Sequence, residues 1–163
     1  MKTAIIFSSK HGTTAKVAQM LAENLKQENT TLYNLLRGHT CKQLNDYDAV
    51  ILGTAIYAGR PIRTIKKFAE KNLKILQTKK LGLFICGMDP NEDKHAEAMK
   101  ATYPQELLEH ATAKYYLGGE FIIEDMSRLE RMIIKKVARV QTSISSLHHE
   151  NIRKFTEDFN EEK

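Results

Sequence analysis

Apolar runs and amphipathic segments alternate along the whole chain. Short runs such as Ala4-Ile5-Ile6-Phe7 have no polar interruption, which is typical of strands buried on both faces of a sheet. The intervening segments place apolar residues at helical spacing, as Val17, Leu21 and Leu25 do. The pattern predicts strands at about 3–8, 30–35, 48–54, 80–86 and 114–118. It predicts helices at about 13–28, 62–77, 92–101, 126–141 and 150–160. This order favours an α/β fold: a doubly wound, five-stranded parallel sheet with right-handed crossovers.

The turn between the first strand and the first helix is rich in hydroxyl groups. The first amides of a helix lack intrahelical acceptors and carry partial positive charge, and Gly12 allows a ligand to approach the backbone closely. We therefore predict a phosphate site here. The alternative is a Ser or Thr that caps the helix without any ligand. The candidate residues are Ser8, Ser9, Lys10, His11, Gly12, Thr13 and Thr14.

The same turn excludes two common nucleotide motifs. A P-loop requires a Gly-Lys-Ser/Thr ending and a dinucleotide fingerprint requires three spaced glycines, whereas this turn contains Gly12 alone.

Two further loops follow the third and fourth strands. The carboxyl ends of parallel strands meet at one edge of the sheet, where ligands bind in this fold class. Tyr57 offers a flat ring that can stack on a cyclic ligand. The alternative is that the glycines only shape a loop and a helix start. The candidate residues are Thr54, Ala55, Ile56, Tyr57, Ala58 and Gly59, then Gly87, Met88 and Asp89.

Length, charge and cysteines narrow the class of protein. The 163 residues suit one domain, no apolar run reaches the length of a membrane span, and Cys41 and Cys86 lie far apart with no metal-ligand spacing. We expect a reducing cytoplasm and no metal site. The net charge is +5, with +9 in residues 1–80 and −4 in residues 81–163. Nucleic acid is not expected, because no stacking or DNA-binding motif accompanies the basic residues.

The chain resembles the flavodoxin family. The run Thr3–Thr14 is similar to the first strand and FMN-phosphate loop of that family, Gly53–Gly59 to its second flavin loop, and Leu83–Gly87 to its fourth strand and third loop. The resemblance implies strand order 2-1-3-4-5 and noncovalently bound FMN. It also implies electron transfer by the flavin itself, with no catalytic side chain.

Within that family, the chain resembles proteins related to menaquinone-dependent protoporphyrinogen dehydrogenase. The similar features are Ser8–Thr14, the Tyr57-Ala58-Gly59 loop, Gly118-Gly119 and the segment Leu129–Lys135. In those relatives an insertion in this region is associated with quinone-linked activity.

The segment 126–141 is an addition to a minimal flavodoxin-like domain spanning 1–163. Met126, Leu129 and Ile133 repeat at helical spacing, while Arg128 and Arg131 fall on another face. Such a basic amphipathic helix fits contact with lipid, a quinone or a partner protein, and so a peripheral position at the membrane. The alternative is an ordinary surface helix with a solvated basic side.

The sequence therefore predicts an FMN-binding redox protein that passes electrons to a partner protein or a quinone. The alternative is a protoporphyrinogen dehydrogenase-like enzyme with a quinone acceptor. A non-redox regulatory domain is the weakest alternative, because Ser8-Ser9 and Gly53-Thr54 stand where a phospho-receiver needs acidic residues. Lys10, His11 and Arg60 lie in or beside the flavin loops, where Asp89 is the only acid, so we expect a less reducing flavin than in acidic flavodoxins.

Overall fold

The five apolar runs form one parallel sheet. The computed structural model describes residues 1–25, 29–121, 126–137 and 144–161. The strands lie in the order β2-β1-β3-β5-β6, with all four neighbouring pairs parallel. Counted without the short β4, this is the predicted order 2-1-3-4-5, so the predicted fold class is confirmed. The strands are β1 (Thr3–Ser8), β2 (Thr30–Asn34), β3 (Ala49–Tyr57), β5 (Lys80–Cys86) and β6 (Ala113–Tyr116).

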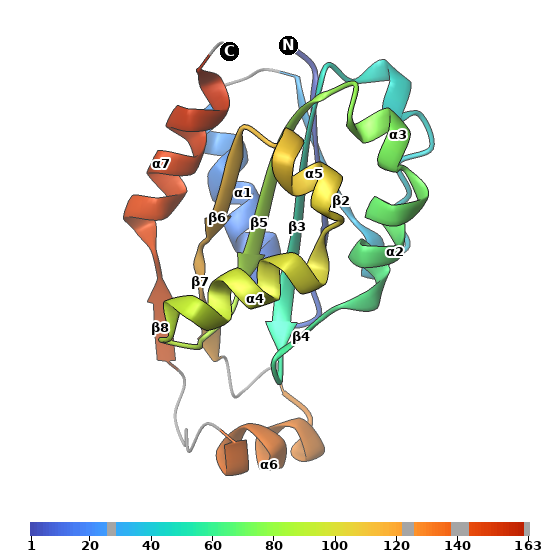
Figure 1. Ribbon diagram of the computed structural model, residues 1–163. Helices are drawn as coiled ribbons and strands as arrows, with labels where there is room; N and C mark the ends of the chain where they lie inside the picture. The colour runs from blue at the N-terminus through green and yellow to red at the C-terminus, as the bar shows by residue number, and fades with distance from the viewer. Residues whose placement is uncertain (26–28, 122–125, 138–143, 162–163) are drawn as a thin grey trace.

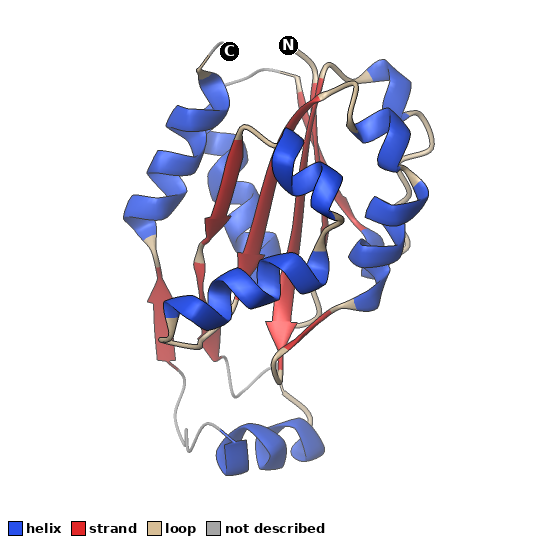
Figure 2. Ribbon diagram, viewed as in Figure 1, coloured by secondary structure: helices blue, strands red, loops and turns tan. Residues whose placement is uncertain are grey.

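Helices cover both faces of this sheet (Figures 1 and 2). One face carries α1 (Thr13–Leu25) and α7 (His149–Asn160). The other carries α2 (Arg63–Lys71), α3 (Leu73–Leu76), α4 (Glu92–Thr102) and α5 (Gln105–His110). Two short 3-10 helices, η1 (Leu35–Arg37) and η2 (Leu44–Asp46), connect β2 to β3.

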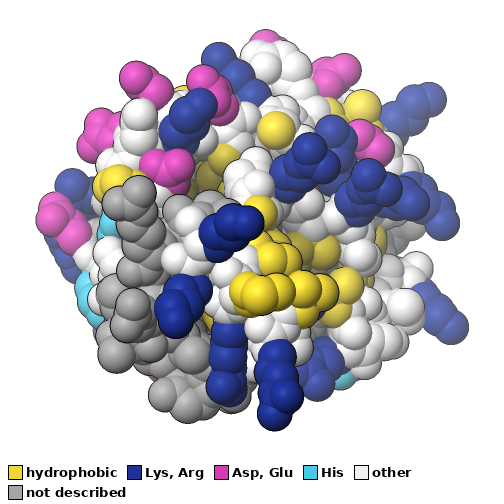
Figure 3. Space-filling view, turned by 90° about the horizontal axis from the view of Figure 1, so that it is seen from below, with side chains coloured by type: hydrophobic (Ala, Val, Ile, Leu, Met, Phe, Trp, Pro, Cys, Tyr) yellow, Lys and Arg dark blue, Asp and Glu magenta, His cyan; other side chains and the backbone are white. Residues whose placement is uncertain are grey.

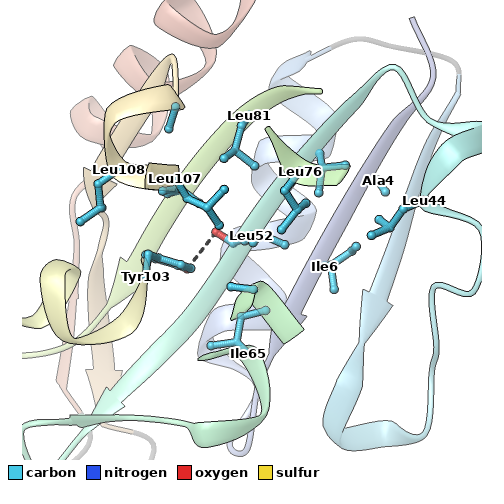
Figure 4. Packing of buried hydrophobic residues seen from close by; sticks show 14 of the residues in the cluster. Ala4, Ile6, Leu44, Leu52, Ile65, Leu76, Leu81, Tyr103, Leu107 and Leu108 are labelled. Carbon is cyan, nitrogen blue, oxygen red and sulfur yellow. Dashed lines mark hydrogen bonds between the residues drawn. The ribbon is translucent and has the colours of Figure 1, made fainter. Parts of the chain in front are cut away.

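Alternate side chains of each strand enter opposite cores. In β1, Ile6 faces the core under α2, α3 and α5, whereas Ile5 and Phe7 face α1 and α7. Every residue of β1 is buried, which explains its uninterrupted apolar pattern. Figure 4 shows Tyr103 reaching from the end of α4 into the first of these cores. Its hydroxyl contacts the carbonyl oxygens of Leu52 (3.1 Å) and Phe84 (2.8 Å), and so links β3 to β5.

The loop expected after the third strand, Thr54–Gly59, is a strand end and a hairpin turn. The strand β3 continues to Tyr57, and β4 (Arg60–Pro61) pairs back on it in antiparallel fashion. Ala58 and Gly59 form the two-residue turn, with φ of 49° and 75°. Gly53 lies inside the strand. A side chain would not fit there, because the ring of Phe84 packs on this residue and a Cβ would lie 1.9 Å from the ring.

The helix expected at 62–77 is two helices. Asn72 interrupts it with φ −106° and ψ 16°, and its side-chain amide donates to the carbonyl oxygen of Phe68 at 2.8 Å. A short polar side chain that bonds to the backbone in this way favours a helix end. The pattern of apolar residues also does not predict the short helix α5. The last turn of the helix expected at 13–28 lies outside the described residues.

A second, two-stranded sheet extends beyond β6. It pairs β7 (Gly118–Phe121) with β8 (Ile144–Leu147), and α6 (Arg128–Val137) lies between them in the chain. Gly118, the first residue of β7, has φ 75°, and a Cβ there would lie 2.1 Å from the carbonyl oxygen of Ser146. The expected helix 126–141 thus corresponds to α6, and residues 138–141 fall outside the described part. Figure 1 shows α6 below the carboxyl edge of the sheet, opposite the chain termini.

Among the described helices, none has both the length and the hydropathy needed to cross a bilayer.

Tyr103→Phe removes the hydroxyl that links β3 to β5 and leaves two carbonyl oxygens in the core with one partner fewer. We expect it to lower the free energy of unfolding by about 1–3 kcal/mol. Tyr115→Phe is the matched control: its hydroxyl donates to the half-buried carboxylate of Asp158 (2.6 Å), where water can replace the lost donor, so we expect a smaller loss. Chemical denaturation measures both; equal losses would contradict the role assigned to Tyr103.

Candidate functional site

The turn after β1 is shaped by Ser9. Its hydroxyl oxygen accepts hydrogen bonds from the backbone amides of Gly12 (3.2 Å) and Ala15 (3.3 Å). Ser9 therefore fulfils the capping role that the sequence left as an alternative for this segment. The other hydroxyl groups of the turn are not needed for that purpose.

Asn34, which the sequence analysis missed, fixes the same turn from the neighbouring strand. Its side-chain oxygen accepts from the amide of Ser9 (3.3 Å), and its side-chain nitrogen donates to the Ser9 carbonyl oxygen (3.4 Å). The same oxygen also accepts from the amide of Leu36 (3.1 Å) and caps η1. An Asn at the end of a predicted strand was the available signal, because Asn is typical of such caps.

The first turn of α1 presents open amides at this edge. Its first helical bond runs from the amide of Lys16 to the carbonyl oxygen of Gly12 (2.9 Å). Within the described chain, the amides of Thr13 and Thr14 have no acceptor. The first turn holds no acidic residue, and Gly12, at φ 93°, has open space on its Cβ side. The partial positive charge of the helix end is thus available to an anion.

Four buried side-chain polar atoms of the described chain lack a hydrogen-bond partner, and all four belong to the predicted site: Ser8 Oγ, His11 Nε2, Thr14 Oγ1 and Tyr57 OH. Of these, His11 Nε2 has a Glu130 carboxylate oxygen 3.6 Å away, beyond hydrogen-bond distance. Buried polar groups are rarely left unpaired, because each one costs about 1–3 kcal/mol. The thiol of Cys86 lies close to the Thr14 hydroxyl, but burial raises the pKa of that thiol to about 12, so it offers only weak hydrogen bonding. The arrangement fits a ligand that supplies the missing partners.

The second loop brings an aromatic ring beside this turn. The ring of Tyr57 lies 6.0 Å from the ring of His11, and the ammonium group of Lys10 lies 5.4 Å from the Tyr57 ring centre. Burial, and then the nearby charge of Glu130, raise the pKa of the Tyr57 hydroxyl, which therefore remains a donor. Thr54 is buried, Ala55 and Ile56 are half-buried, and the turn Ala58-Gly59 is exposed.

The third loop is held by neighbouring backbone and rings. The amide of Gly87 donates to the carbonyl oxygen of Gly118 (3.0 Å), and a Cβ on Gly119 would lie 2.7 Å from the Gly87 carbonyl oxygen. The carbonyl oxygen of Asp89 contacts both His95 Nε2 and the Tyr116 hydroxyl, whose rings stack 3.4 Å apart.

The carboxylate of Asp89 accepts from the amide of Asn91 (2.9 Å), so it shapes its own loop. Met88, which precedes it, is half-buried. No pattern along the chain predicts that His95 and Tyr116 stack, because α4 and β6 meet only in the fold.

Glu130, at the start of α6, enters the site from outside the three loops. It forms a salt bridge with Lys10, and its second carboxylate oxygen lies 3.6 Å from His11 Nε2. Ser127 and Glu130 also cap α6 reciprocally. The Ser127 amide donates to the Glu130 carboxylate (3.0 Å), and the Glu130 amide donates to the Ser127 hydroxyl oxygen (3.3 Å). The Lys10 ammonium, aided by the Ser127 amide, lowers the pKa of Glu130 to about 2, and the same bond raises the pKa of Lys10.

This contact changes the charge expected at the site. From the sequence we expect Lys10, His11 and Arg60 in or beside the flavin loops, with Asp89 as the only acidic residue there. In the structure Glu130 pairs with Lys10, Lys16 pairs with Glu120 (2.8 Å), and Arg60 is exposed at the hairpin. The spacing Ser127-x-x-Glu130 is the sequence signature of a capping box and was the available signal for the helix start, but not for the contact with Lys10.

An anion-binding turn, an aromatic loop and a third loop thus meet at the carboxyl edge of a doubly wound sheet, as in nucleotide-binding proteins of this fold class. The family model described as flavodoxin domain matches residues 4–157. The chain therefore belongs to the flavodoxin domain family, and the predicted family is confirmed. Membership of this family supports FMN as the cofactor.

Solved structures agree with the fold. Oxidised Flavodoxin 1 from Bacillus cereus is 18% identical, with a TM-score of 0.57, covering 86% of this chain and 100% of its own. Flavodoxin 2 from the same organism is 20% identical, with a TM-score of 0.53, covering 98% and 97%. A flavodoxin, WrbA-like protein from Agrobacterium tumefaciens is 24% identical, with a TM-score of 0.51, covering 85% and 95%. Comparison with curated proteins gave no match.

Acid should release α6 from the site. The folded protein holds the pKa of Glu130 at about 2, below the value of about 4.3 in an unfolded chain. The stabilisation is therefore present above about pH 4.3 and is lost as the pH falls towards 2. Hydrogen exchange of the α6 amides, corrected for the chemical exchange rate, should accelerate over this range before that of β1. Glu130→Gln should abolish this pH dependence; an unchanged profile would contradict the assigned contact.

Proposed function

We propose that this protein is an FMN-dependent electron-transfer protein. The observation that carries the proposal is that the buried hydroxyls without a partner, those of Ser8, Thr14 and Tyr57, all lie in the predicted loops. The phosphate is assigned to the open amides of Thr13 and Thr14 and to the hydroxyls of Ser8 and Thr14. The flavin ring is assigned to the space beside Tyr57 and the third loop, Gly87–Asp89.

Bound FMN would supply the transfer of one or two electrons. The protein side chains bind and orient the cofactor, and none is assigned a catalytic role. Tyr57 provides a ring for stacking, which contributes about 0.5–1.5 kcal/mol beyond burial of area. The Lys10–Glu130 pair places one positive and one negative charge close to that ring. Both cysteines are unpaired, which supports the expected reducing cytoplasm.

The acceptor we propose is a redox partner protein or a quinone, and one observation favours a second candidate. His11 and Glu130 form an imidazole and carboxylate pair, 3.6 Å apart, next to Tyr57. Oxidation of a porphyrinogen releases protons as well as electrons, and the His11 imidazole, which lies beside Tyr57, offers a proton acceptor. A protoporphyrinogen dehydrogenase-like enzyme is therefore the second candidate. Protoporphyrinogen-dependent reduction of a menaquinone analogue that Glu130→Gln abolishes would distinguish it from a carrier.

Thr14→Ala should weaken FMN much more than riboflavin. The substitution removes a buried hydroxyl assigned to the phosphate, and loss of a hydrogen bond to a charged group costs about 1.5–3 kcal/mol, or roughly 10-fold to 150-fold in affinity. Titration of apoprotein with FMN and with riboflavin measures this difference. Thr64→Ala on α2, outside the loops, is the matched control and should change neither affinity. Equal affinity of the wild type for FMN and riboflavin would contradict the phosphate assignment.

The charge pair at the site should tune the flavin potential in opposite directions. Reduction adds negative charge to the flavin, so Glu130→Gln should raise the potential and Lys10→Gln should lower it. A change of about 1.4 kcal/mol corresponds to about 60 mV for one electron. Screening by solvent and salt should hold the shifts to about 10–60 mV. Redox titration of both single variants and the double variant measures these potentials. The potential of the double variant should lie close to that of the wild type. Shifts of the same sign in both singles would contradict the pairing.

A further inference from the structure

The outward face of α6 is both apolar and basic. Among the described side chains, the exposed large apolar residues are Met1, Leu36, Leu129, Met132 and Ile133, and the last three belong to α6. Leu129 is 62% exposed and Met132 is 60% exposed. Seen from this end of the molecule, Figure 3 shows apolar side chains gathered together with Lys and Arg around them. A folded chain has no internal reason to leave neighbouring apolar side chains in water.

The positive charge of α6 is turned outward and its negative charge inward. The helix carries Arg128, Arg131, Lys135 and Lys136, all exposed, and Arg131 also donates through its Nε to the carbonyl oxygen of Met126 (3.1 Å). Glu130 is its only acidic residue. Glu130 is bound to Lys10 and lies beside His11, so it does not neutralise the outer face. The same contacts hold α6 against the flavin loops, which fixes the direction in which its outer face points.

From this geometry we infer that the outer face of α6 docks on an anionic lipid surface. Leu129, Met132 and Ile133 enter the boundary between headgroups and acyl chains, and the basic side chains reach the phosphate layer. Because α6 lies over the carboxyl edge of the sheet, this orientation turns the three loops towards the bilayer. The inference stands on the surface of α6 and does not require a bound cofactor.

The charge and composition of α6 argue against a second copy of this chain or another protein as the occupant of this face. A symmetric contact with a second copy would bring the same four cations of α6 against each other. Protein interfaces are enriched in aromatic side chains and depleted in Lys at their cores, whereas the apolar face of α6 has no aromatic residue and is flanked by Lys135 and Lys136. An anionic lipid surface satisfies both the apolar and the basic residues.

Co-sedimentation of the full-length protein with vesicles tests this inference. We expect binding to vesicles of phosphatidylcholine mixed with phosphatidylserine, and much weaker binding to phosphatidylcholine alone. Lys135→Gln with Lys136→Gln should lower the partition coefficient on the anionic vesicles by about 25-fold, since each basic residue near such a surface contributes about fivefold. Leu129→Ser with Met132→Ser should lower it by at least about tenfold, since it removes apolar area from the lipid contact.

The matched control is Lys66→Gln with Lys67→Gln, which removes the same charge from exposed positions on α2. It should leave the partition coefficient within about twofold. An equal loss in this control would overturn the inference, because attraction would then be general rather than local to α6. It would also be overturned by absent binding to anionic vesicles, or by a concentration-dependent dimer that Leu129→Ser with Met132→Ser dissociates.

FMN titration and circular dichroism of the same variants separate this inference from the proposed function. If the α6 variants keep their fold and their affinity for FMN but no longer bind vesicles, the result supports docking through α6. Vesicle binding that persists when FMN does not bind would leave the inference standing and overturn only the proposed function.

Discussion

The fold depends on how the central strand β1 ends. The strand is buried on both faces, and its last residue, Ser8, is buried as well, so its chain must leave the sheet without exposing the core. The exchange of hydrogen bonds between Ser9 and Asn34, together with the two amides bound by the Ser9 hydroxyl, allows this exit. The first turn of α1 is thereby fixed with its open amides at the carboxyl edge. The helix cap and the anion site are consequences of one local structure.

The site carries buried side-chain polar atoms without a partner, and the rest of the described chain carries none. The described core is otherwise well paired, as the two contacts of the Tyr103 hydroxyl illustrate. Ser8, Thr14 and Tyr57 nevertheless bury hydroxyls with no partner. Such groups reduce the stability of the folded chain, and a ligand that bonds to them restores it. This is the physical reason for expecting binding of the cofactor and stability of the protein to be linked.

Glu130 couples two parts of the molecule that are separate in the sequence. As the third residue of α6 it closes the reciprocal cap with Ser127, and as a carboxylate it binds Lys10 in the flavin loop. Movement of the helix away from the site therefore breaks the salt bridge with Lys10 and the contact with His11. The same contact sets the orientation of the exposed apolar residues Leu129 and Met132. Electrostatics at the cofactor and the direction of the outer surface are thus linked through one side chain.

The sequence by itself determined the fold class, the strand order through the family resemblance, and the three loops at one edge. Short uninterrupted apolar runs bounded by turn residues favour buried strands, and the hydroxyl-rich turn at Ser8–Thr14 is local to the chain, so both were visible without the fold. The sequence pattern predicts neither the extension of β3 beyond Thr54 to Tyr57 nor the break at Asn72, because pairing with β4 and a bond to the Phe68 carbonyl oxygen decide these two features. The tertiary structure alone brought Asn34, His95, Tyr116 and Glu130 to the site. These residues act across 25 or more positions or between separate elements, and no periodicity along a chain encodes which distant side chains will meet.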